Sequence, residues 1–359
     1  MIRVGLVGFG MAGRVFHGPL ISSVDGLELA AVVERNSSNA PSINNAAQRY
    51  PGITTYRTLD DLLADASLDL FVVATPSGTH FQVARQILEA GKNVVVDKPL
   101  STTTPEIAQL IKLAAARKVH LIPFFNRRWD SDFQTIQKLL HEGPLGHLVY
   151  LESRFDRWRP NPPSDRLWKE DPTLGGGVLL DLGTHIADQA LTLFGKPESI
   201  AADVLCERDW ARVNDAFTLR LRYPNLTVVL GANCLSSPPR PRFHLRGTKG
   251  NYIKSGLDPQ EAALNKVTRV EDPQWGHEPA ADWGTLHVDV DGSMVTRPVS
   301  PIPGDYRHYY AAVRDTILGK ATAPIAPVEA WRVARLLEWA EESSDQRREI
   351  ECDWSEEPD

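Results

Sequence analysis

The feature that most constrains the fold is a regular alternation of two hydrophobic patterns across residues 1–125. Five short apolar runs, RVGLVGF, LELAAVVE, LDLFVVATP, NVVVDKP and VHLIPFF, are separated by helical patterns such as THFQVARQILEAG. Nearly continuous apolar strands that alternate with helices predict a parallel sheet covered on both faces. We therefore expect residues 1–125 to form one α/β domain.

A different pattern begins near Gly146, where strand-like runs follow one another with turns between them. These runs are LVYLESRF, SIAADVLCE, DAFTLRLRY, LTVVLGANCL and RFHLRG. They predict a mainly antiparallel sheet, in an α+β domain that we place at residues 126–330. Residues 255–303, rich in Pro, Gly and Asp, are interpreted as loops with a short hairpin. Residues 331–359 predict a helix that packs back on the first domain, followed by a frayed tail.

The segment VGFGMAG has the spacing G-x-G-x-x-G, directly after the first predicted strand and at the start of a helix. That context makes the spacing a dinucleotide-binding motif. Gly8 permits the tight turn, Gly10 lets the backbone approach the pyrophosphate, and Gly13 lets helix and strand pack closely. The alternative is a glycine-rich turn without a ligand. The loop residues assigned to the cofactor are Gly8, Phe9, Gly10, Met11, Ala12 and Gly13.

Two charged residues follow the second predicted strand. Glu34 lies about 20 residues beyond the last glycine, where a carboxylate accepts hydrogen bonds from the adenosine ribose and repels a 2′-phosphate. Arg35 can instead pair with a 2′-phosphate, stack on adenine, or lie solvated at the surface. Glu34 favours NAD(H) as the cofactor, and Arg35 keeps NADP(H) as the alternative.

Other candidate residues lie at the carboxyl ends of later strands, the edge at which open parallel sheets bind ligands. Thr75, Pro76 and His80 follow the fourth strand and Asn126 follows the sixth, and we assign them to the cofactor. His80 has a second interpretation, as a residue that only starts the next helix.

Lys98 ends an apolar strand in VVVDKPL, at the same edge of the sheet. A lysine that emerges from a buried strand needs a partner or a function, and a lysine beside a cofactor can donate or accept a proton. Asp97 precedes it and is assigned to the cofactor site, while the sequence leaves a cis or trans Lys98–Pro99 peptide open. The alternative is a lysine that merely reaches solvent.

The segment GGGVLLDLGTHIADQALTLFG, residues 175–195, predicts one helix with an unusual polar stripe, because the stripe contains no Lys, Arg or Glu. Apolar residues fill the other faces, so the stripe must face a cleft or a polar network. Asp181 and His185, one turn apart, suit proton transfer to or from an alcohol. A buried hydrogen-bond network and a metal site of Asp181, His185 and Asp188 are alternatives. We expect no metal, and we expect Asp188 and Gln189 to serve packing or a subunit contact.

At these residues the chain resembles the Gfo/Idh/MocA family, the group of glucose–fructose oxidoreductase and inositol dehydrogenase. The family's Glu-Lys-Pro motif appears as Asp97-Lys98-Pro99, with a shorter acid, and its D-x-x-x-H helix matches Asp181 and His185. VFHGPL, TPSGTH, FFNRRWDSDF and LGTHIADQ resemble, more narrowly, the scyllo-inositol dehydrogenases.

The resemblance implies a Rossmann domain joined to an open-faced, mainly antiparallel sheet domain, in a homodimer or homotetramer formed through that sheet. It also implies an NAD(P)-dependent dehydrogenase or reductase that acts on CH–OH groups of a polyol or sugar, with Lys98, Asp181 and His185 as catalytic residues.

The candidate substrate residues are Arg127, Trp158, Arg166 and Trp168. Aromatic and guanidinium faces suit a polyhydroxylated ring, although they can equally pack the sheet. Two other functions stay open: a non-catalytic regulator that senses a dinucleotide, and a glycosidase that uses bound NAD for transient oxidation.

Composition narrows the partners. The 359 residues carry a net charge of −7, which argues against nucleic acid and anionic membrane surfaces, and no apolar run is long enough to span a membrane. The N-terminal segment lacks the regions of a signal peptide, and three cysteines without a CxxC pair argue against a disulfide framework or zinc site. We therefore expect a cytoplasmic protein that acts on a small molecule.

Overall fold

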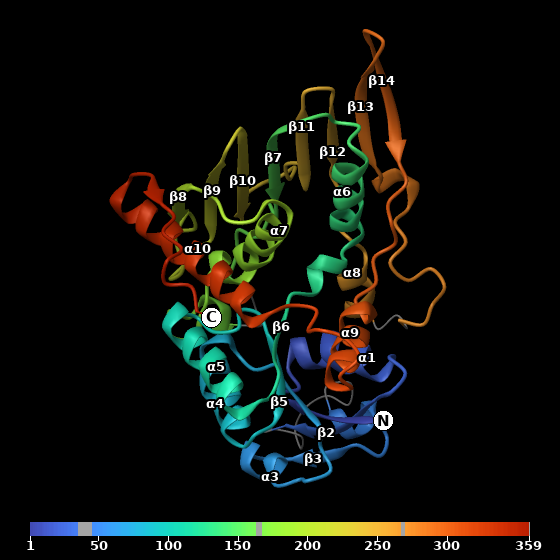
Figure 1. The fold of residues 1–359 in the computed structure, drawn as a ribbon, viewed down its shortest axis with the longest axis vertical. Coiled ribbons are helices and arrows are strands. Elements are labelled where there is room, and N and C mark those ends of the chain that lie inside the picture. The colour runs from blue at the N-terminus through green and yellow to red at the C-terminus, as the bar shows by residue number, and fades with distance from the viewer. Residues whose placement is uncertain (35–44, 163–166, 267–269, 359) are drawn as a thin grey trace.

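The computed structural model describes residues 1–34, 45–162, 167–266 and 270–358. These residues form two domains, one around a six-stranded sheet and one around a nine-stranded sheet (Figure 1). Among the described helices, none combines the length and the apolar character needed to cross a membrane.

The first domain is a parallel sheet in the order β3-β2-β1-β4-β5-β6. Its strands are β1 (Ile2–Val7), β2 (Leu27–Val33), β3 (Thr54–Tyr56), β4 (Leu70–Val73), β5 (Asn93–Asp97) and β6 (Leu121–Phe124). β4 and β6 are buried along their whole length, as their continuous apolar runs predict. The winding of the chain reverses between β1 and β4, which is where open α/β sheets form a ligand crevice.

Helices cover both faces of this sheet: α4 packs with α5, while α1 packs with α9 from the end of the chain (Figure 1). The helices and helical turns up to the domain connection are η1 (Gly13–His17), α1 (Gly18–Ser22), α2 (Ala46–Arg49), α3 (Leu59–Leu63), η3 (Ser77–Thr79), α4 (His80–Glu89), α5 (Thr104–Arg117), η4 (Asn126–Trp129) and α6 (Ser131–Glu142). The last two lead from β6 into the second domain.

The second domain is a sheet in the order β14-β13-β12-β11-β7-β10-β9-β8-β15. All neighbours are antiparallel except β7 and β10, so the prediction of a mainly antiparallel sheet is confirmed. The strands are β7 (Leu148–Arg154), β8 (Ser199–Leu205), β9 (Ala216–Tyr223), β10 (Leu226–Asn233), β11 (Phe243–Gly247), β12 (Gly250–Lys254), β13 (Gly284–Val290), β14 (Ser293–Val299) and β15 (Ile350–Glu351). The helices and helical turns are η5 (Leu167–Glu170), η6 (Pro172–Leu174), η7 (Leu179–Gly183), α7 (Thr184–Phe194), α8 (Gln260–Asn265) and η8 (Ala280–Asp282).

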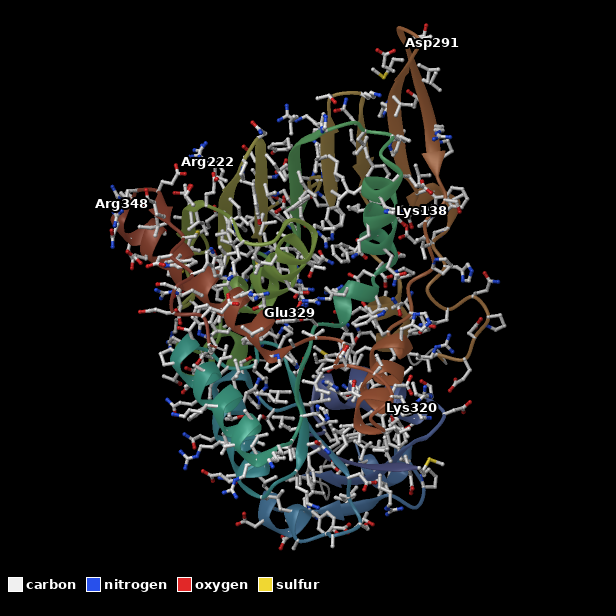
Figure 2. The ribbon with its side chains drawn as sticks, in the orientation of Figure 1. Lys138, Arg222, Asp291, Lys320, Glu329 and Arg348 are labelled. Carbon is white, nitrogen blue, oxygen red and sulfur yellow. The ribbon has the colours of Figure 1, made fainter. Side chains whose placement is uncertain are left out.

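The described part of residues 255–303 contains more regular structure than predicted. It contains α8 and the long hairpin of β13 and β14, whose tip at Asp291 projects from the end of the molecule (Figure 2). β14 is exposed along almost its whole length. A strand that buries neither face has no apolar alternation, and for this reason the sequence indicated only a short hairpin in this region.

The helix predicted over residues 175–195 is also shorter than expected. Gly175 and Gly177 have φ values of +75° and +110°, which keep them in a loop. A π-helical turn, η7, then leads into α7. Asp181 lies in the turn and His185 in the helix that continues it.

The end of the chain contains more regular structure than the predicted helix and frayed tail. It forms α9 (Arg307–Ile317) and α10 (Pro327–Gln346), followed by β15. Glu338 on α10 accepts a hydrogen bond from the backbone N of Thr104 in the first domain at 2.8 Å. β15 adds to the second sheet, and the Trp354 ring meets Trp339 edge-on with centroids 4.8 Å apart. The tail that was predicted to fray is therefore held against the second domain.

Candidate functional site

A large cleft lies between the carboxyl edge of the first sheet and the second domain. It encloses about 1540 Å³, more than the roughly 300–1,000 Å³ of a single small-molecule site. The predicted residues that line it are Gly8, Phe9, Gly10, Met11, Ala12, Glu34, Thr75, Pro76, Asp97, Lys98, Asn126, Arg127, Trp158, Asp181 and His185. Gly13 and His80 are not on its surface. Arg35, Arg166 and the side chain of Trp168 lie outside what the structure describes.

The glycine loop shapes the cleft where β1 ends. Gly8 has φ +99°, a conformation that favours glycine. A Cβ on Gly13 would lie 2.1 Å from the carbonyl oxygen of Gly8, whereas a Cβ on Gly10 would meet nothing within 4 Å. One glycine therefore turns the chain, one packs the helix, and one faces open space. This arrangement fits a dinucleotide cradle, with Gly10 leaving room for the phosphates.

Glu34 lines the cleft directly after β2 and is buried. Its Oε2 accepts a hydrogen bond from the backbone N of Ala46 at 3.2 Å, and Arg57 donates to its carbonyl oxygen at 3.0 Å. The carboxylate is thus held at the wall of the cleft, in the position from which Rossmann enzymes bind the adenosine ribose.

His80 supports the wall of the cleft from behind. Its Nδ1 lies 2.7 Å from the carbonyl oxygen of Pro99 and its Nε2 lies 2.8 Å from that of Thr75. The imidazole ties the loop after β4 to the turn after β5, where the Lys98–Pro99 peptide is cis. Both ring nitrogens are used and the residue is buried, so the geometry gives His80 a positioning function in place of the predicted cofactor contact.

At the end of the cleft away from the glycine loop, two lysines bind Asp181. Lys98 Nζ donates to Asp181 Oδ1 at 2.9 Å and to its carbonyl oxygen at 2.7 Å, and Lys169 Nζ donates to Oδ2 at 2.8 Å. Burial acts to raise the pKa of Asp181, but the charges of the two lysines and of Arg157 outweigh it and hold the pKa well below its ordinary value. Asp181 is therefore a carboxylate at neutral pH, with both oxygens bound by ammonium groups.

Lys169 is a site residue that the sequence analysis missed. It lies in η5, 12 residues before Asp181, and the glycine-rich turn separates the two. Burial lowers the pKa of Lys169, and the nearby carboxylate of Asp181 opposes that shift. No helical or strand period relates the two positions, so a pattern search could not pair them.

His185 follows Asp181 by one turn and is 6% exposed. Burial, and then the charges of Lys98 and Arg127, lower the pKa of the imidazole well below its ordinary value. Its Nδ1 has no hydrogen-bond partner among the described residues. The ring is therefore neutral at neutral pH, which is the form that accepts a proton.

Each of the two domains matches a domain of the same protein family. Residues 2–125 match the Gfo/Idh/MocA oxidoreductase family with its NAD-binding Rossmann fold, and residues 137–352 match the C-terminal alpha/beta domain of that family. The chain belongs to the Gfo/Idh/MocA family. It is therefore an oxidoreductase with an NAD(P)-binding Rossmann domain, as the motifs predicted.

Individual members of the Gfo/Idh/MocA family match over nearly the whole chain. The chain is 39% identical over 346 residues to the uncharacterized oxidoreductase YdgJ of Escherichia coli (strain K12), a match that covers 96% of this chain and 97% of YdgJ. It is 33% identical over 349 residues to IolW of Bacillus subtilis (strain 168), a scyllo-inositol 2-dehydrogenase (NADP(+)), covering 97% and 95%. The solved structure of the oxidoreductase yvaA from Bacillus subtilis has a TM-score of 0.92 and 32% identity, covering 98% of this chain and 99% of that one.

The acid of the Gfo/Idh/MocA Glu-Lys-Pro motif is the shorter Asp97 in this chain, and it still finds partners. Asp97 Oδ1 accepts from the backbone N of Lys98 at 2.8 Å, and Oδ2 lies 3.7 Å from His17 Nε2. His17 Nδ1 in turn lies 2.6 Å from the hydroxyl of Tyr310. Burial acts to raise the pKa of Asp97, but the neighbouring His17 imidazole and the positive charge of Lys98 lower it overall. His17 and Tyr310, which the sequence analysis missed, thus anchor the turn that carries Lys98.

The remaining polar residues of α7 point away from the cleft. Asp188 accepts hydrogen bonds from Arg128 Nε at 2.9 Å and Nη2 at 2.6 Å, and Gln189 accepts one from Arg242 at 2.8 Å. Both are 2% exposed, so they serve internal packing and not a subunit contact. No group of three or more His, Cys, Asp or Glu side chains in the described ranges is arranged to hold a metal ion.

Arg127 and Trp158 stand on the second-domain side of the cleft. Arg127 is held by Asp130 at 3.2 Å and by Glu261, and its guanidinium carbon lies 5.1 Å from the centre of the Phe155 ring. Trp158 is 60% exposed, so its ring is presented to whatever occupies the cleft.

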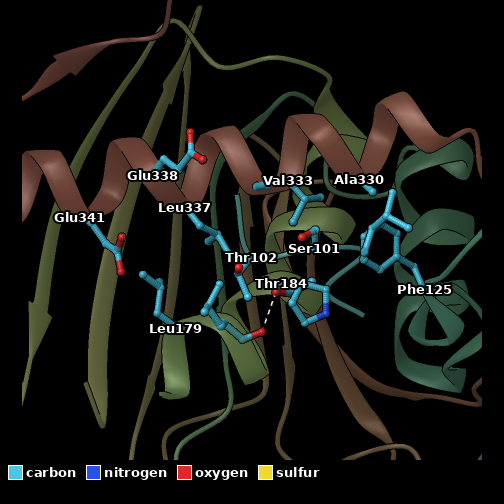
Figure 3. Close-up of a pocket in the computed structure, with 14 residues that line it drawn as sticks. Ser101, Thr102, Phe125, Leu179, Thr184, Ala330, Val333, Leu337, Glu338 and Glu341 are labelled. Carbon is cyan, nitrogen blue, oxygen red and sulfur yellow. Dashed lines mark hydrogen bonds between the residues drawn. The ribbon is translucent and has the colours of Figure 1, made fainter. Parts of the chain in front are cut away.

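A second, smaller pocket lies between α7 and α10, away from the large cleft (Figure 3). Apolar side chains such as Leu179, Val333 and Leu337 form much of its lining, and Thr184 at its wall donates to the carbonyl oxygen of Leu180 at 2.6 Å. It encloses about 50 Å³, which is space for water and not for a dinucleotide. The large cleft is therefore the candidate active site.

Proposed function

We propose that this protein transfers a hydride reversibly between a nicotinamide cofactor and a secondary alcohol or ketone of a cyclic polyol or sugar. One observation carries the proposal: a lysine held by a carboxylate and a neutral, buried histidine line the same cleft as a dinucleotide-binding glycine loop. The relative IolW is named for an inositol, which supports a cyclic polyol as the first substrate to test.

In the proposed mechanism the bound nicotinamide supplies the hydride acceptor or donor. His185 accepts the proton of the substrate hydroxyl during oxidation and returns it during reduction. Lys98 donates a hydrogen bond to the same substrate oxygen and stabilises the negative charge that develops there. Asp181 holds the ammonium groups of Lys98 and Lys169 at 2.9 and 2.8 Å, so its proposed role is to position these lysines.

Glu34 supports NAD(H) as the preferred cofactor, because its carboxylate would repel a 2′-phosphate. Gly8, Gly10 and Glu34 would hold the adenosine and phosphate end, and Asn126 lines the cleft nearer to the reacting groups. The name of IolW specifies NADP(+), so NADP(H) is the alternative that the experiment must include.

We also propose a homodimer or homotetramer formed through the second sheet. Arg220 and Arg222 on β9 are exposed and alternate with the buried Leu219, Leu221 and Tyr223, so they lie on the face of the sheet opposite to the core. Light scattering of the purified protein would test the assembly.

Free Cys206, Cys234 and Cys352 support a reducing compartment such as the cytoplasm.

The decisive test follows the absorbance of the reduced nicotinamide while inositols and sugars are offered with NAD and, separately, with NADP. Stoichiometric cofactor reduction by a polyol supports the proposal. Tight cofactor binding without turnover would favour a dinucleotide-sensing regulator, and hydrolysis of glycosides with NAD required but not consumed would favour a glycosidase.

A further inference from the structure

We infer that the substrate carries an anionic group, a carboxylate or a phosphate, on its polyhydroxylated ring, and that Arg157 binds this group. The inference rests on the proposed function and specifies its substrate class. It arises from the pairing of charges around Asp181.

Arg157 is placed firmly in the second-domain wall of the cleft. Its backbone N donates to the carbonyl oxygen of Asn233 at 2.9 Å, and its carbonyl oxygen accepts from the backbone N of Ser236 at 2.9 Å. The side chain is half-buried and lines the cleft beside Trp158 and Arg159. Arg157 lines the same cleft as Asp181, His185 and Glu261, and its charge contributes to the low pKa values of Asp181 and Glu261.

The carboxylates of this part of the cleft are already bound to other cations. Asp181 is bound by Lys98 and Lys169. Glu261 is bound by Arg127, and Glu170 lies 3.5 Å from Arg208.

The carboxylate next to Arg157 in sequence is occupied as well, because Asp156 binds Arg154 at 3.1 Å and Arg240 at 3.0 Å. Within the described ranges, neither Arg157 nor Arg159 has a carboxylate within ion-pair distance. A half-buried guanidinium that lacks a partner is costly. An anionic ligand would remove that cost by supplying two oxygens to the fork of donors.

The cofactor is a poor candidate for this anion. Its phosphates belong at the glycine loop and the helix that follows it, in the first domain, whereas Arg157 belongs to the second domain and lies near Asp181. The chain as a whole carries a net charge of −7, so unpaired cations inside the cleft make a local field that attracts an anion. Neutral polyols would gain nothing from that field.

The experiment compares matched substrates on the intact protein with its preferred cofactor. Values of kcat/KM are measured for glucose, glucuronate and glucose 6-phosphate, and for inositol and inositol 1-phosphate, which separates carboxylate from phosphate. We expect an anionic member to be preferred in at least one series. Arg157→Gln should lower kcat/KM for that substrate roughly 10- to 100-fold, the loss typical of a hydrogen bond to a charged group.

Arg85→Gln is the matched control, because it removes one positive charge from an exposed position on α4 outside the cleft. It should leave the preference unchanged, and Arg157→Lys should restore part of it. In parallel, inorganic phosphate is titrated into the protein–NADH complex and followed by NADH fluorescence. Phosphate should bind to the wild type and to Arg85→Gln more tightly than to Arg157→Gln.

Several outcomes would overturn the inference. One is equal kcat/KM for the neutral members and their anionic counterparts, and another is an equal loss of kcat/KM for both in Arg157→Gln. A weaker affinity for NADH in Arg157→Gln would assign the residue to the cofactor. If Arg157→Gln does not fold, the inference is tested by two other measurements. These are the preference of the wild type for anionic over neutral substrates and the affinity of Arg159→Gln for inorganic phosphate. Absence of all turnover, with phosphate bound in an Arg157-dependent way, would refute the proposed function and leave the anion site standing.

Discussion

The first-domain wall of the cleft is made from backbone and glycine, whereas the second-domain wall is made from ion-paired side chains. At the first wall Gly8 adopts a positive φ, and Gly10 leaves open space beside the backbone. Gly13 lies so close to Gly8 that a Cβ on it would be 2.1 Å from the Gly8 carbonyl oxygen. At the second wall Asp181 binds Lys169 at 2.8 Å, and Lys98 reaches the same carboxylate at 2.9 Å from the end of β5 in the first domain. The two walls thus present a shape to one ligand and a set of charges to the other.

A dinucleotide is common to many enzymes, and a glycine loop binds its phosphates without regard to the reaction. In the proposed function, substrate specificity depends on charged side chains brought together from separate segments. If shape dominates the first wall and charge the second, variants of the two walls should differ in what they lose.

Lys98→Met should have the largest effect. Turnover should fall about 10²- to 10⁴-fold, the range for loss of a positioned proton donor or acceptor, while Lys169 still holds Asp181. Steady-state kcat on the best substrate measures the loss, and the thermal unfolding midpoint controls for folding. Near-normal turnover would show that charge at the second wall does not drive the chemistry.

Asp188→Leu should instead lower stability. The substitution removes the carboxylate that binds Arg128 at 2.6 Å. Removing one partner of a buried ion pair lowers the free energy of unfolding by on the order of 3 kcal/mol. Denaturant unfolding measures the change, and kcat of the folded protein should stay the same. Glu329→Gln removes the more exposed partner of Arg128 and should cost only about 0–1 kcal/mol. A loss of kcat in Asp188→Leu would place this residue in the catalytic group.

Gly13→Ala and Gly10→Ala separate packing from ligand space within the first wall. Gly13→Ala forces a Cβ against the Gly8 carbonyl oxygen and should lower the free energy of unfolding by about 1–3 kcal/mol. Gly10→Ala meets no protein atom within 4 Å, so its stability should stay close to that of the wild type while its affinity for NADH falls. Equal behaviour of the two variants in unfolding and in NADH titration would contradict the assignment.

Lys169→Met should reduce kcat/KM roughly tenfold, because one of the charge-assisted hydrogen bonds to Asp181 is lost. Its distinctive signature is a pH profile. Removing a positive charge raises the pKa of Asp181, so the acid limb of kcat/KM should move to higher pH. An unshifted acid limb would reduce Lys169 to a structural residue.

The smallest effect concerns stability and pH. The pKa of His185 is held below its ordinary value of 6.5 by burial and nearby cations, so below pH 6.5 the unfolded chain binds a proton that the folded chain does not. The free energy of unfolding should therefore fall as the pH drops, by at most about 1.4 kcal/mol per pH unit from this residue. His185→Gln should reduce that slope when unfolding is compared at pH 7 and pH 5. An unchanged slope would show that His185 titrates normally in the folded state.

Much of the first wall could be predicted from the sequence. The spacing of Gly8, Gly10 and Gly13 after a strand fixed the loop, and Glu34, Lys98 and Asn126 were expected at the carboxyl edge because parallel strands bring their ends together. His80 also fell on that edge, but only the structure shows that both its ring nitrogens bind carbonyl oxygens.

Less of the second wall could be predicted. Asp181 and His185 were found because a helical turn relates them. Lys169 and Arg157 were not found, because each reaches the site from a segment with no periodic relation to α7. His17, in η1 of the first domain, was missed because no sequence pattern relates it to Asp97.

By itself the sequence determined the alternation of strands and helices, the glycine loop and the Asp181–His185 pair. These features depend on residues close together in the chain, or on rules that hold for every parallel sheet. The tertiary structure decided which carboxylate binds which cation, why Asp188 packs inside while Asp181 faces the cleft, and that Arg157 stands without a partner among the described residues. Pairing of charges depends on distance in space, and a linear order of residues does not contain that distance.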